Sequence, residues 1–246
     1  MARIPGDPHT LRADRDAPVT VVTPGLVPYA IAWAWQRALA ERRAAGEIGD
    51  VVLLLEHPAV YTLGRRADES NLVLSAAERE RRGIELFHID RGGDVTYHGP
   101  GQLVGYPILK LSAPRVVDYV RGLEEVNIRV AASYGISAGR VEGFSGVWVG
   151  DAKLTAVGVR VDAGRVTQHG WATNVTTDLG DFGGIVPCGI TDKAVTSLAQ
   201  LGVPEVSVPA VIERTCAALA DVFGVTLVTS TPDELGLTTK RSEVPS

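Results

Sequence analysis

Three consecutive stretches in which apolar residues recur at every second position constrain the fold more than any other feature of this chain. They span residues 147–149, 152–161 and 165–175, and the turn signals Gly150-Asp151 and Asp162-Ala163-Gly164 separate them. A period of two is typical of β-strands, and such short turns join strands that run antiparallel. The sequence therefore predicts an antiparallel meander in the second half of the chain.

Helical periodicity occurs on both sides of this meander. Ile31, Trp35 and Leu39 lie on one stripe of a predicted helix that begins at Pro28 and runs to about residue 45. Two more helices are predicted between residues 112 and 135 and over 209–223, and short strands are predicted at 51–55, 84–89, 103–109 and 225–228. Because helices and hairpins are interspersed without a repeating βαβ unit, we expect an α+β fold, with a mixed or antiparallel sheet flanked by helices.

The two ends of the chain differ in composition from the part between them. Residues 1–18 and 231–246 are polar, contain proline and show no apolar periodicity, so we predict flexible tails around a single domain of residues 19–230. The longest apolar runs are far shorter than the roughly 20 residues that span a bilayer. The first tail also lacks the apolar segment of a secretory signal. We therefore expect a cytoplasmic protein.

Composition and motifs exclude several classes of function. Two cysteines in 246 residues cannot form a disulfide framework, and none of the five histidines has the spacing of a metal site, so we expect no metal. The net charge of −5 disfavours a general nucleic-acid binder. No phosphate-binding P-loop is present, and valine at position 147 breaks a serine-hydrolase elbow.

Cys188 is a candidate nucleophile because it lies between Pro187 and Gly189, outside any periodic stripe. The alternative is a small buried hydrophobe, which is a common role for a free cysteine. Cys216 lies on the apolar stripe of the last predicted helix, where core packing is expected. The reactive form of Cys188 is the thiolate, so catalysis by this residue needs a base.

Lys153 is the candidate base. In the predicted strand 152–161, alternation places Lys153 on the same face as Thr155 and Val157, which should be the buried face. Burial lowers the pKa of an ammonium group and can bring it close enough to neutral pH for proton exchange. In the alternative, Lys153 begins the strand and extends to solvent beside Asp151.

Residues 91–102 contain four glycines and one proline and are predicted to form an ordered loop. His98 in this loop and His169 are candidate polar groups of a pocket, and a structural hydrogen bond is the alternative for each. A basic run, Arg79 with Arg81 and Arg82, could either dock an acidic carrier or form a solvated helix face.

Four separated motifs in this order resemble the lipoyl(octanoyl) transferase family. They are the run from Arg91 to Pro107, Lys153, the segment His169-Gly170-Trp171-Ala172-Thr173-Asn174, and Pro187-Cys188-Gly189 followed by Thr196-Ser197-Leu198. The resemblance extends from about residue 51 to residue 198. It implies an α+β catalytic domain similar to those of lipoate and biotin protein ligases.

The resemblance also implies an activity. Members of this family transfer an octanoyl group from octanoyl-acyl carrier protein to a lysine on lipoyl domains of 2-oxoacid dehydrogenases or on the glycine-cleavage H protein. The position of Cys188 matches the cysteine that carries the acyl thioester, and Lys153 matches the lysine that lowers its pKa. No cofactor is implied, because the phosphopantetheine arm of the carrier supplies the acyl group.

Three segments align with those that enclose the acyl substrate in the family. They comprise Arg91, Gly92, Gly93, Asp94, Val95, Thr96, Tyr97 and His98, then Ala156, Val157 and Gly158, and then Gly170, Trp171 and Ala172, with His169 and Asn174 as further polar groups. Thr155 and Thr173 depart from the usual pattern, in which apolar residues are commoner. Two alternatives remain on sequence grounds: an ATP-dependent lipoate or biotin ligase, or a non-catalytic acyl-binding module of the same fold.

Overall fold

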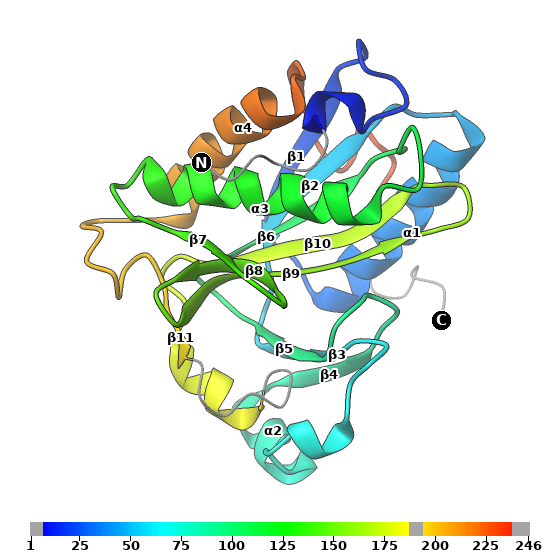
Figure 1. Cartoon of the computed structure of the whole chain (residues 1–246). Helices are drawn as coiled ribbons and strands as arrows, with labels where there is room; N and C mark the ends of the chain where they lie inside the picture. The colour runs from blue at the N-terminus through cyan, green and yellow to red at the C-terminus, as the bar shows by residue number, and fades with distance from the viewer. Residues whose placement is uncertain (1–6, 187–193, 238–246) are drawn as a thin grey trace.

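The structure, a computed structural model, describes residues 7–186 and 194–237 and is built around a large mixed β-sheet (Figure 1). The strand order is β12-β1-β2-β6-β10-β9-β8-β7, and β11 also pairs with β9. The bounds are β1 Val19–Leu26, β2 Val51–Glu56, β6 Gln102–Ile108, β7 Gly139–Val141, β8 Phe144–Val149, β9 Ala152–Val161, β10 Thr167–Asn174, β11 Ala194–Val195 and β12 Leu227–Ser230. The pairs β1–β12, β1–β2 and β9–β11 are parallel, and the other pairs are antiparallel.

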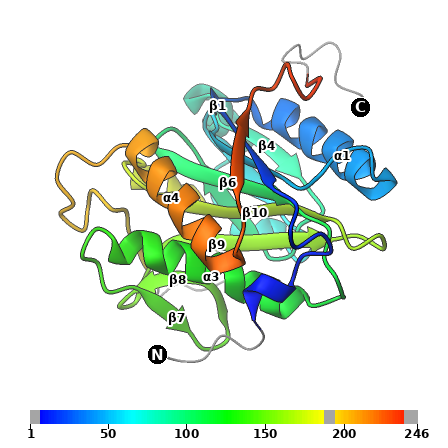
Figure 2. The same cartoon turned by 90° about the horizontal axis from the view of Figure 1, so that it is seen from above.

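Helices cover both faces of this sheet (Figure 2). Helix α1 (Tyr29–Ala45) packs on one face, where Trp35 and Leu39 join a buried apolar cluster with Leu53 of β2. Helices α3 (Val116–Ala132) and α4 (Val208–Phe223) pack on the opposite face, and their buried apolar side chains belong to a second cluster. The predicted α+β fold, with a mixed sheet flanked by helices, is confirmed.

A smaller sheet lies below the large one in Figure 1. Its order is β4 (Glu85–His88), β3 (Val60–Leu63) and β5 (Val95–His98), and helix α2 (Ala76–Arg82) lies next to it. Short 3-10 helices occur at η1 Pro8–Thr10, η2 Glu69–Asn71 and η3 Leu179–Gly184. The prediction that residues 91–102 are only a loop is wrong, because β5 pairs antiparallel with β3 inside that stretch.

The predicted meander is confirmed as β8, β9 and β10, which pair antiparallel in sequence order. One detail differs from simple alternation. Val147 pairs with Thr155 whereas Trp148 pairs with Lys153, so Leu154 is an extra residue in β9 at this point. Such a bulge locally changes the direction in which side chains point, which sequence periodicity does not reveal.

The described parts of both predicted tails contact the core. Leu11 and Arg12 are buried, and the Nε atom of Arg12 lies 2.6 Å from a carboxylate oxygen of Asp50. The other carboxylate oxygen of Asp50 lies 2.7 Å from Nε of Arg43. At the other end Leu237 is buried against the α1 cluster. Within residues 7–186 and 194–237, no helix is long and apolar enough to span a membrane.

Candidate active site

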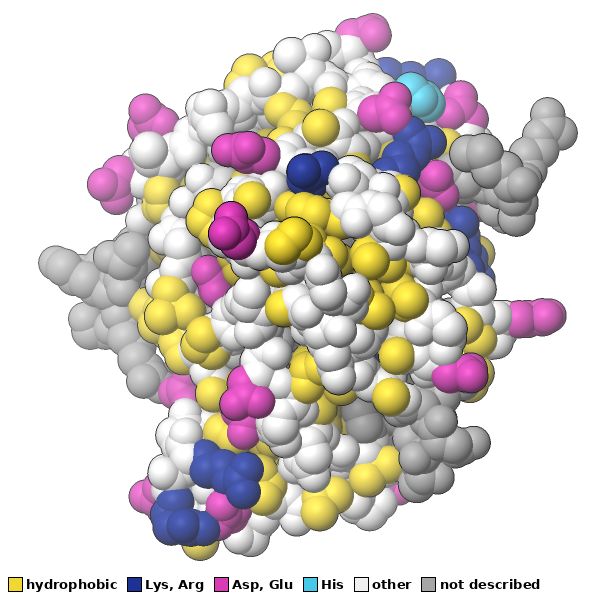
Figure 3. All heavy atoms as spheres, turned by 90° about the vertical axis from the view of Figure 1, so that its left-hand side faces the viewer, with side chains coloured by type: hydrophobic (Ala, Val, Ile, Leu, Met, Phe, Trp, Pro, Cys, Tyr) yellow, Lys and Arg dark blue, Asp and Glu magenta, His cyan; other side chains and the backbone are white. Residues whose placement is uncertain are grey.

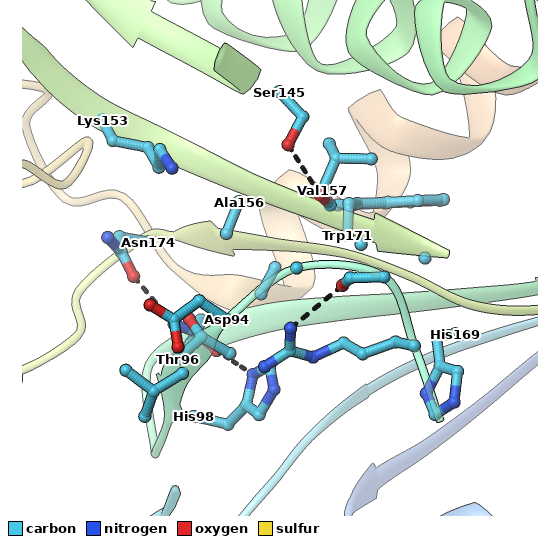
Figure 4. Close-up of a pocket in the computed structure, with 18 of the residues that line it drawn as sticks. Asp94, Thr96, His98, Ser145, Lys153, Ala156, Val157, His169, Trp171 and Asn174 are labelled. Atoms are coloured by element: carbon cyan, nitrogen blue, oxygen red, sulfur yellow. Dashed lines mark hydrogen bonds between the residues drawn. The ribbon is translucent and has the colours of Figure 1, made fainter. Parts of the chain in front are cut away.

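A cavity enclosing about 850 Å³ of empty space, part of it open to solvent, lies between the β9–β10 part of the large sheet and the segment that leads into β5 (Figure 4). Its lining consists of Tyr29, Arg91, Gly92, Gly93, Asp94, Val95, Thr96, His98, Gln102, Tyr106, Ser145, Lys153, Ala156, Val157, Gly158, His169, Gly170, Trp171, Ala172, Asn174, Phe182 and Val195. The structure thus brings the three aligned segments together with Lys153, His169 and Asn174, although they are distant in sequence.

Tyr97 is the one described residue of the aligned segments that does not line this cavity. Its ring packs edge-on against Phe182, and its hydroxyl donates a hydrogen bond to a carboxylate oxygen of Asp181 at 3.0 Å. Alternation along β5 explains this placement, because the neighbours Thr96 and His98 point to the other face. The Tyr97 side chain therefore packs on the face of β5 that points away from the cavity.

Several lining residues were not identified from the sequence. Tyr29 and Tyr106 come from α1 and β6 and read as ordinary core residues in a linear pattern. Gln102, Ser145 and Val195 also carry no distinctive sequence signal. Only the assembly of α1 with strands β6, β8 and β11 of the large sheet brings these side chains to the same cavity.

Cys188 and its flanking residues 187–193 lie outside the described residues. The chain on both sides of this segment is defined. The backbone N–H of Val186 donates to the carbonyl of Asn71 at 2.8 Å. After the segment, Ala194 and Val195 of β11 pair with Ala152 and Lys153 of β9.

Lys153 is half-buried and lines the cavity (Figure 4). Its ammonium nitrogen lies 4.7 Å from the centre of the Trp148 ring, a cation–π distance. Thr155, by contrast, is fully buried and bonds toward α3, so the prediction that Lys153 shares its buried surroundings is wrong. The extra residue at Leu154 separates the two positions.

Close backbone packing brings the Arg91–Asp94 segment against the sheet. Gly158 and Gly170 are paired across β9 and β10. A Cβ on Gly158 would lie 2.9 Å from the carbonyl oxygen of Gly92, and one on Gly170 would lie 2.1 Å from that of Gly105. Only glycine allows these approaches, so both positions are required for the cavity wall.

The Arg91 side chain is buried and lines the cavity. Its guanidinium donates to the carbonyl and the hydroxyl of Thr62 at 2.7 and 3.0 Å and to the carbonyl of Gly92 at 3.1 Å. These bonds fix the side chain, because a guanidinium presents its donors in a rigid planar arrangement.

His98 begins a chain of buried hydrogen bonds. Its Nδ1 lies 2.8 Å from the side-chain oxygen of Gln102, and the Gln102 amide donates to Asn174 at 2.9 Å. The Asn174 amide in turn donates to the carbonyl of Thr196 at 2.9 Å. Because the Gln102 oxygen only accepts, His98 carries its proton on Nδ1, and Nε2 is left as an acceptor.

Burial keeps two neighbouring histidines neutral. Desolvation, together with the nearby His57, lowers the pKa of His98 to about 3. The pKa of His57 falls to about 4, again mainly through burial. His57 contacts the carbonyl of Val27 and the hydroxyl of Tyr106, both at 2.7 Å. Neither imidazole is therefore a suitable proton acceptor near neutral pH.

His169 occupies an unusual backbone conformation, with a φ of 57° inside β10. Its backbone N–H donates to the side chain of Gln36 at 2.8 Å, and its Nε2 lies 2.8 Å from a carboxylate oxygen of Asp90. Burial lowers the pKa of His169 despite this carboxylate, and the hydrogen bond from His169 lowers the pKa of Asp90. A neutral His169 imidazole that donates to an ionised Asp90 carboxylate accounts for both lowered pKa values.

The two departures from the family pattern contact each other. The hydroxyls of Thr155 and Thr173 are 2.9 Å apart, and Thr173 donates to the side-chain oxygen of Asn127 at 2.7 Å. All three residues are buried. The two threonines therefore form one polar unit between the sheet and α3, behind the cavity wall.

The predicted basic run is largely paired. Arg81 and Arg82 both contact Glu78, and Arg79 donates to the carbonyl of Leu74 at 2.7 Å. Figure 3 shows basic side chains together with acidic ones at the lower end of the molecule, where α2 lies. In the described chain, no cluster of His, Cys, Asp and Glu is arranged to hold a metal ion.

The fold and the cavity define a domain of the lipoyl ligase class. Residues 28–220 match the family described as Lipoyl protein ligase A/B catalytic domain. Lipoate-protein ligase A, solved with bound ATP, superposes with a TM-score of 0.68 at 14% identity, covering 88% of this chain and 89% of that one. A biotin protein ligase from Leishmania major aligns at a TM-score of 0.50 and 10% identity, covering 84% and 75%. Identities this low establish the fold alone.

A much closer relative is known from its sequence. An octanoyltransferase from Chloroflexus aggregans is 51% identical over 211 residues, which are 83% of this chain and 95% of that protein. The chain therefore belongs to the octanoyltransferase family within the lipoyl ligase class. It is an acyltransferase of protein lipoylation.

Proposed function

We propose that this chain moves an octanoyl group from octanoyl-acyl carrier protein to the acceptor lysine of lipoyl domains, through a thioester on Cys188. One observation carries the proposal. Lys153 lines the same cavity as the three aligned segments, and it pairs with Val195 in the short strand that follows the Cys188 segment. The base and the strand that follows the proposed nucleophile are thus joined at the start of the same strand, β9.

In the first half-reaction the Cys188 thiolate attacks the thioester carbonyl of the donor. The new carbon–sulfur bond forms as the bond to the carrier thiol breaks. Lys153 takes the proton from Cys188 and returns it to the departing carrier thiol. Thiol and amine titrate as a pair, so apparent pKa values belong to both groups together.

In the second half-reaction the neutral amine of the acceptor lysine attacks octanoyl-Cys188. An amide forms as the carbon–sulfur bond to Cys188 breaks. Lys153 accepts the proton that the attacking amine releases, and it then transfers this proton to the Cys188 thiolate. The donor is already an activated thioester, so neither ATP nor a cofactor takes part. Acyl carrier protein and a lipoyl domain are the two partners, and the reaction takes place in the cytoplasm.

The acyl chain occupies the space between Ala156–Gly158 and Gly170–Ala172 on one side and the Arg91–His98 segment on the other. Lys153 and His169 lie at opposite ends of this cavity (Figure 4). Val159 pairs with His169 and lies six residues beyond Lys153, about 20 Å along β9. An octanoyl chain has seven carbon–carbon bonds and a contour of no more than about 11 Å, so it fits inside this span.

Intact mass analysis tests the covalent step. We expect an octanoyl adduct after incubation with octanoyl-acyl carrier protein in the absence of ATP and acceptor. Cys188→Ala should lose the adduct, whereas Cys216→Ser, which changes the half-buried cysteine of α4, should retain it. Native enzyme that forms no adduct while transferring octanoyl to a lipoyl domain would overturn the covalent route. If octanoyl transfer occurred only with ATP, the chain would be a ligase. If the chain bound the octanoyl carrier without any transfer, it would be a non-catalytic module.

Lys153→Met tests the base separately. Methionine keeps an unbranched stem beside Trp148 but removes the ammonium group. Single-turnover acylation should slow by about 10²-fold or more, the usual range for loss of a general base. Lys110→Met serves as the matched control because Lys110 does not line the cavity. Equal single-turnover rates for the Lys153 variant and the wild type would remove Lys153 from the mechanism.

A further inference from the structure

A polar pair at the cavity wall links the substrate segment to the chain that leads into Cys188. Asp94 lines the cavity and is buried. One of its carboxylate oxygens accepts a hydrogen bond from the Asn71 side-chain amide at 2.7 Å, and the other accepts from the backbone N–H of Asp68 at 3.3 Å. Asp94 therefore fixes η2, the short 3-10 helix that ends at Asn71.

The backbone of Asn71 then holds the chain before Cys188. Its carbonyl accepts from the N–H of Val186 at 2.8 Å, and the next residue, Leu72, forms an antiparallel bridge with Ile185. Val73 adds a bond from its N–H to the carbonyl of Gly184 at 2.9 Å. These contacts join the two segments as a short two-stranded pairing that ends at Val186.

The position of Val186 limits that of Cys188 through covalent geometry alone. Consecutive Cα atoms are about 3.8 Å apart, so the Cα of Cys188 lies within about 8 Å of that of Val186. The position of Val186 therefore sets where the segment that bears Cys188 starts. The chain after the segment is fixed independently, by the pairing of Val195 with Lys153.

We propose that Asn71 and Asp94 are a positioning pair that sets the register of Val186 and so holds the Cys188 thiol in place relative to Lys153. Asn71 is the last residue of η2, whereas Asp94 belongs to the wall that encloses the acyl chain. The pair couples these two regions by a hydrogen bond to a carboxylate acceptor, which is stronger than one between neutral groups. This inference rests on the proposed function, because it needs Cys188 as nucleophile and Lys153 as base.

A reversed pair provides a sharp test. In Asn71→Asp two carboxylates face each other and the hydrogen bond is replaced by repulsion. In the double variant Asn71→Asp/Asp94→Asn, the amide introduced at position 94 can donate to the carboxylate introduced at position 71. The side-chain oxygen at position 94 can still accept from the backbone N–H of Asp68. The double variant thus restores the bond with its direction reversed.

The readout is the rate of Cys188 alkylation by iodoacetamide as a function of pH, measured in a Cys216→Ser background. Alkylation by this small reagent does not require an acyl chain in the cavity. We expect Asn71→Asp to slow alkylation at pH 7 by about tenfold and to move the midpoint of the profile upward, with little change at high pH where the thiolate forms without help. The double variant should recover the wild-type profile.

Ser75→Ala is the matched control for general loss of stability. The Ser75 side chain caps α2 by accepting from the N–H of Glu78, whereas the N–H of Val186 donates to the carbonyl of Asn71. It should lower the melting temperature without moving the alkylation profile. An unchanged profile in Asn71→Asp, or one that the double variant fails to restore, would overturn the positioning role. If wild-type enzyme forms no octanoyl adduct on Cys188, the proposed function falls and this inference falls with it.

Discussion

The two buried histidines beside the cavity should make the fold sensitive to mild acid. His57 and His98 have folded-state pKa values of about 4 and about 3, both below the ordinary value of 6.5 that applies when the chain unfolds. Between these values the unfolded state binds more protons than the folded state. Stability therefore rises with pH through this window, is complete above about pH 6.5, and is lost progressively as the pH falls toward 4.

The magnitude follows from these pKa values. At pH 5 an unfolded histidine is almost fully protonated, whereas His57 and His98 in the folded chain are almost fully neutral. Each residue then removes about 2 kcal/mol of the free energy of unfolding relative to pH 8, and the pair removes about 4 kcal/mol. This is a large part of the about 5–15 kcal/mol that stabilises a typical domain. His169, whose pKa is also lowered, adds in the same direction.

Urea denaturation at pH 8, 6.5, 5.5 and 5 measures this loss. Most carboxylates stay ionised in both states over this range, so histidines dominate the slope. His57→Gln should reduce the loss between pH 8 and 5 by about 2 kcal/mol. His88→Gln, which changes an exposed histidine, should leave it unaltered. NMR titration of the imidazole protons provides a direct second reading. A free energy of unfolding that stays constant from pH 8 to 5, or ring protons of His57 that titrate near pH 6.5, would refute the argument.

Two further predictions concern packing and charge. Gly170→Ala should destabilise the fold by about 2 kcal/mol, a fall of about 4–8 °C in melting temperature, because its Cβ would meet the Gly105 oxygen. Gly183→Ala, with open space around it, should change little by calorimetry, and equal effects of both changes would contradict the packing argument. Asp50→Asn should cost about 3 kcal/mol or more in urea denaturation, since it leaves two buried arginines without their carboxylate. The exposed Asp221→Asn should cost under about 1 kcal/mol, and a similar loss in both variants would refute a special role for the buried network.

The periodic parts of the fold could be predicted from the sequence. Strand β9 has the bounds expected from alternation, and α1 starts one residue after Pro28. What periodicity could not show is the insertion of Leu154 opposite β8, because the count of two residues against one depends on the partner strand. Alternation alone therefore placed Lys153 on the buried face with Thr155, whereas Lys153 lines the cavity.

The contacts of residues 7–18 with the core could not be predicted for a different reason. Residues 7–18 are polar in composition, and composition indicated a free tail. Arg12 is nevertheless buried because Asp50 and two backbone carbonyls accept its donors. A buried charge of this kind depends on partners far away in sequence, which composition cannot reveal. The same limit applies to Tyr29 and Tyr106, whose place in the cavity depends on how two sheets meet.

Several polar groups of the cavity wall are hydrogen-bonded within the protein, which suits a substrate made of methylene groups. Asp94 is bonded to Asn71 and Asp68, Arg91 to Thr62 and Gly92, and His98 to Gln102. An acyl chain that displaces water from such a surface leaves these bonds intact, so these groups do not offset the gain from apolar burial. Among the described lining residues, the indole N–H of Trp171 differs, because it is buried and makes no hydrogen bond. A cavity with the same residues but unpaired side chains would lose about 1–3 kcal/mol for each group deprived of water. The hydrogen bonds that fix the wall are thus also the condition for an apolar ligand to bind a wall rich in polar residues.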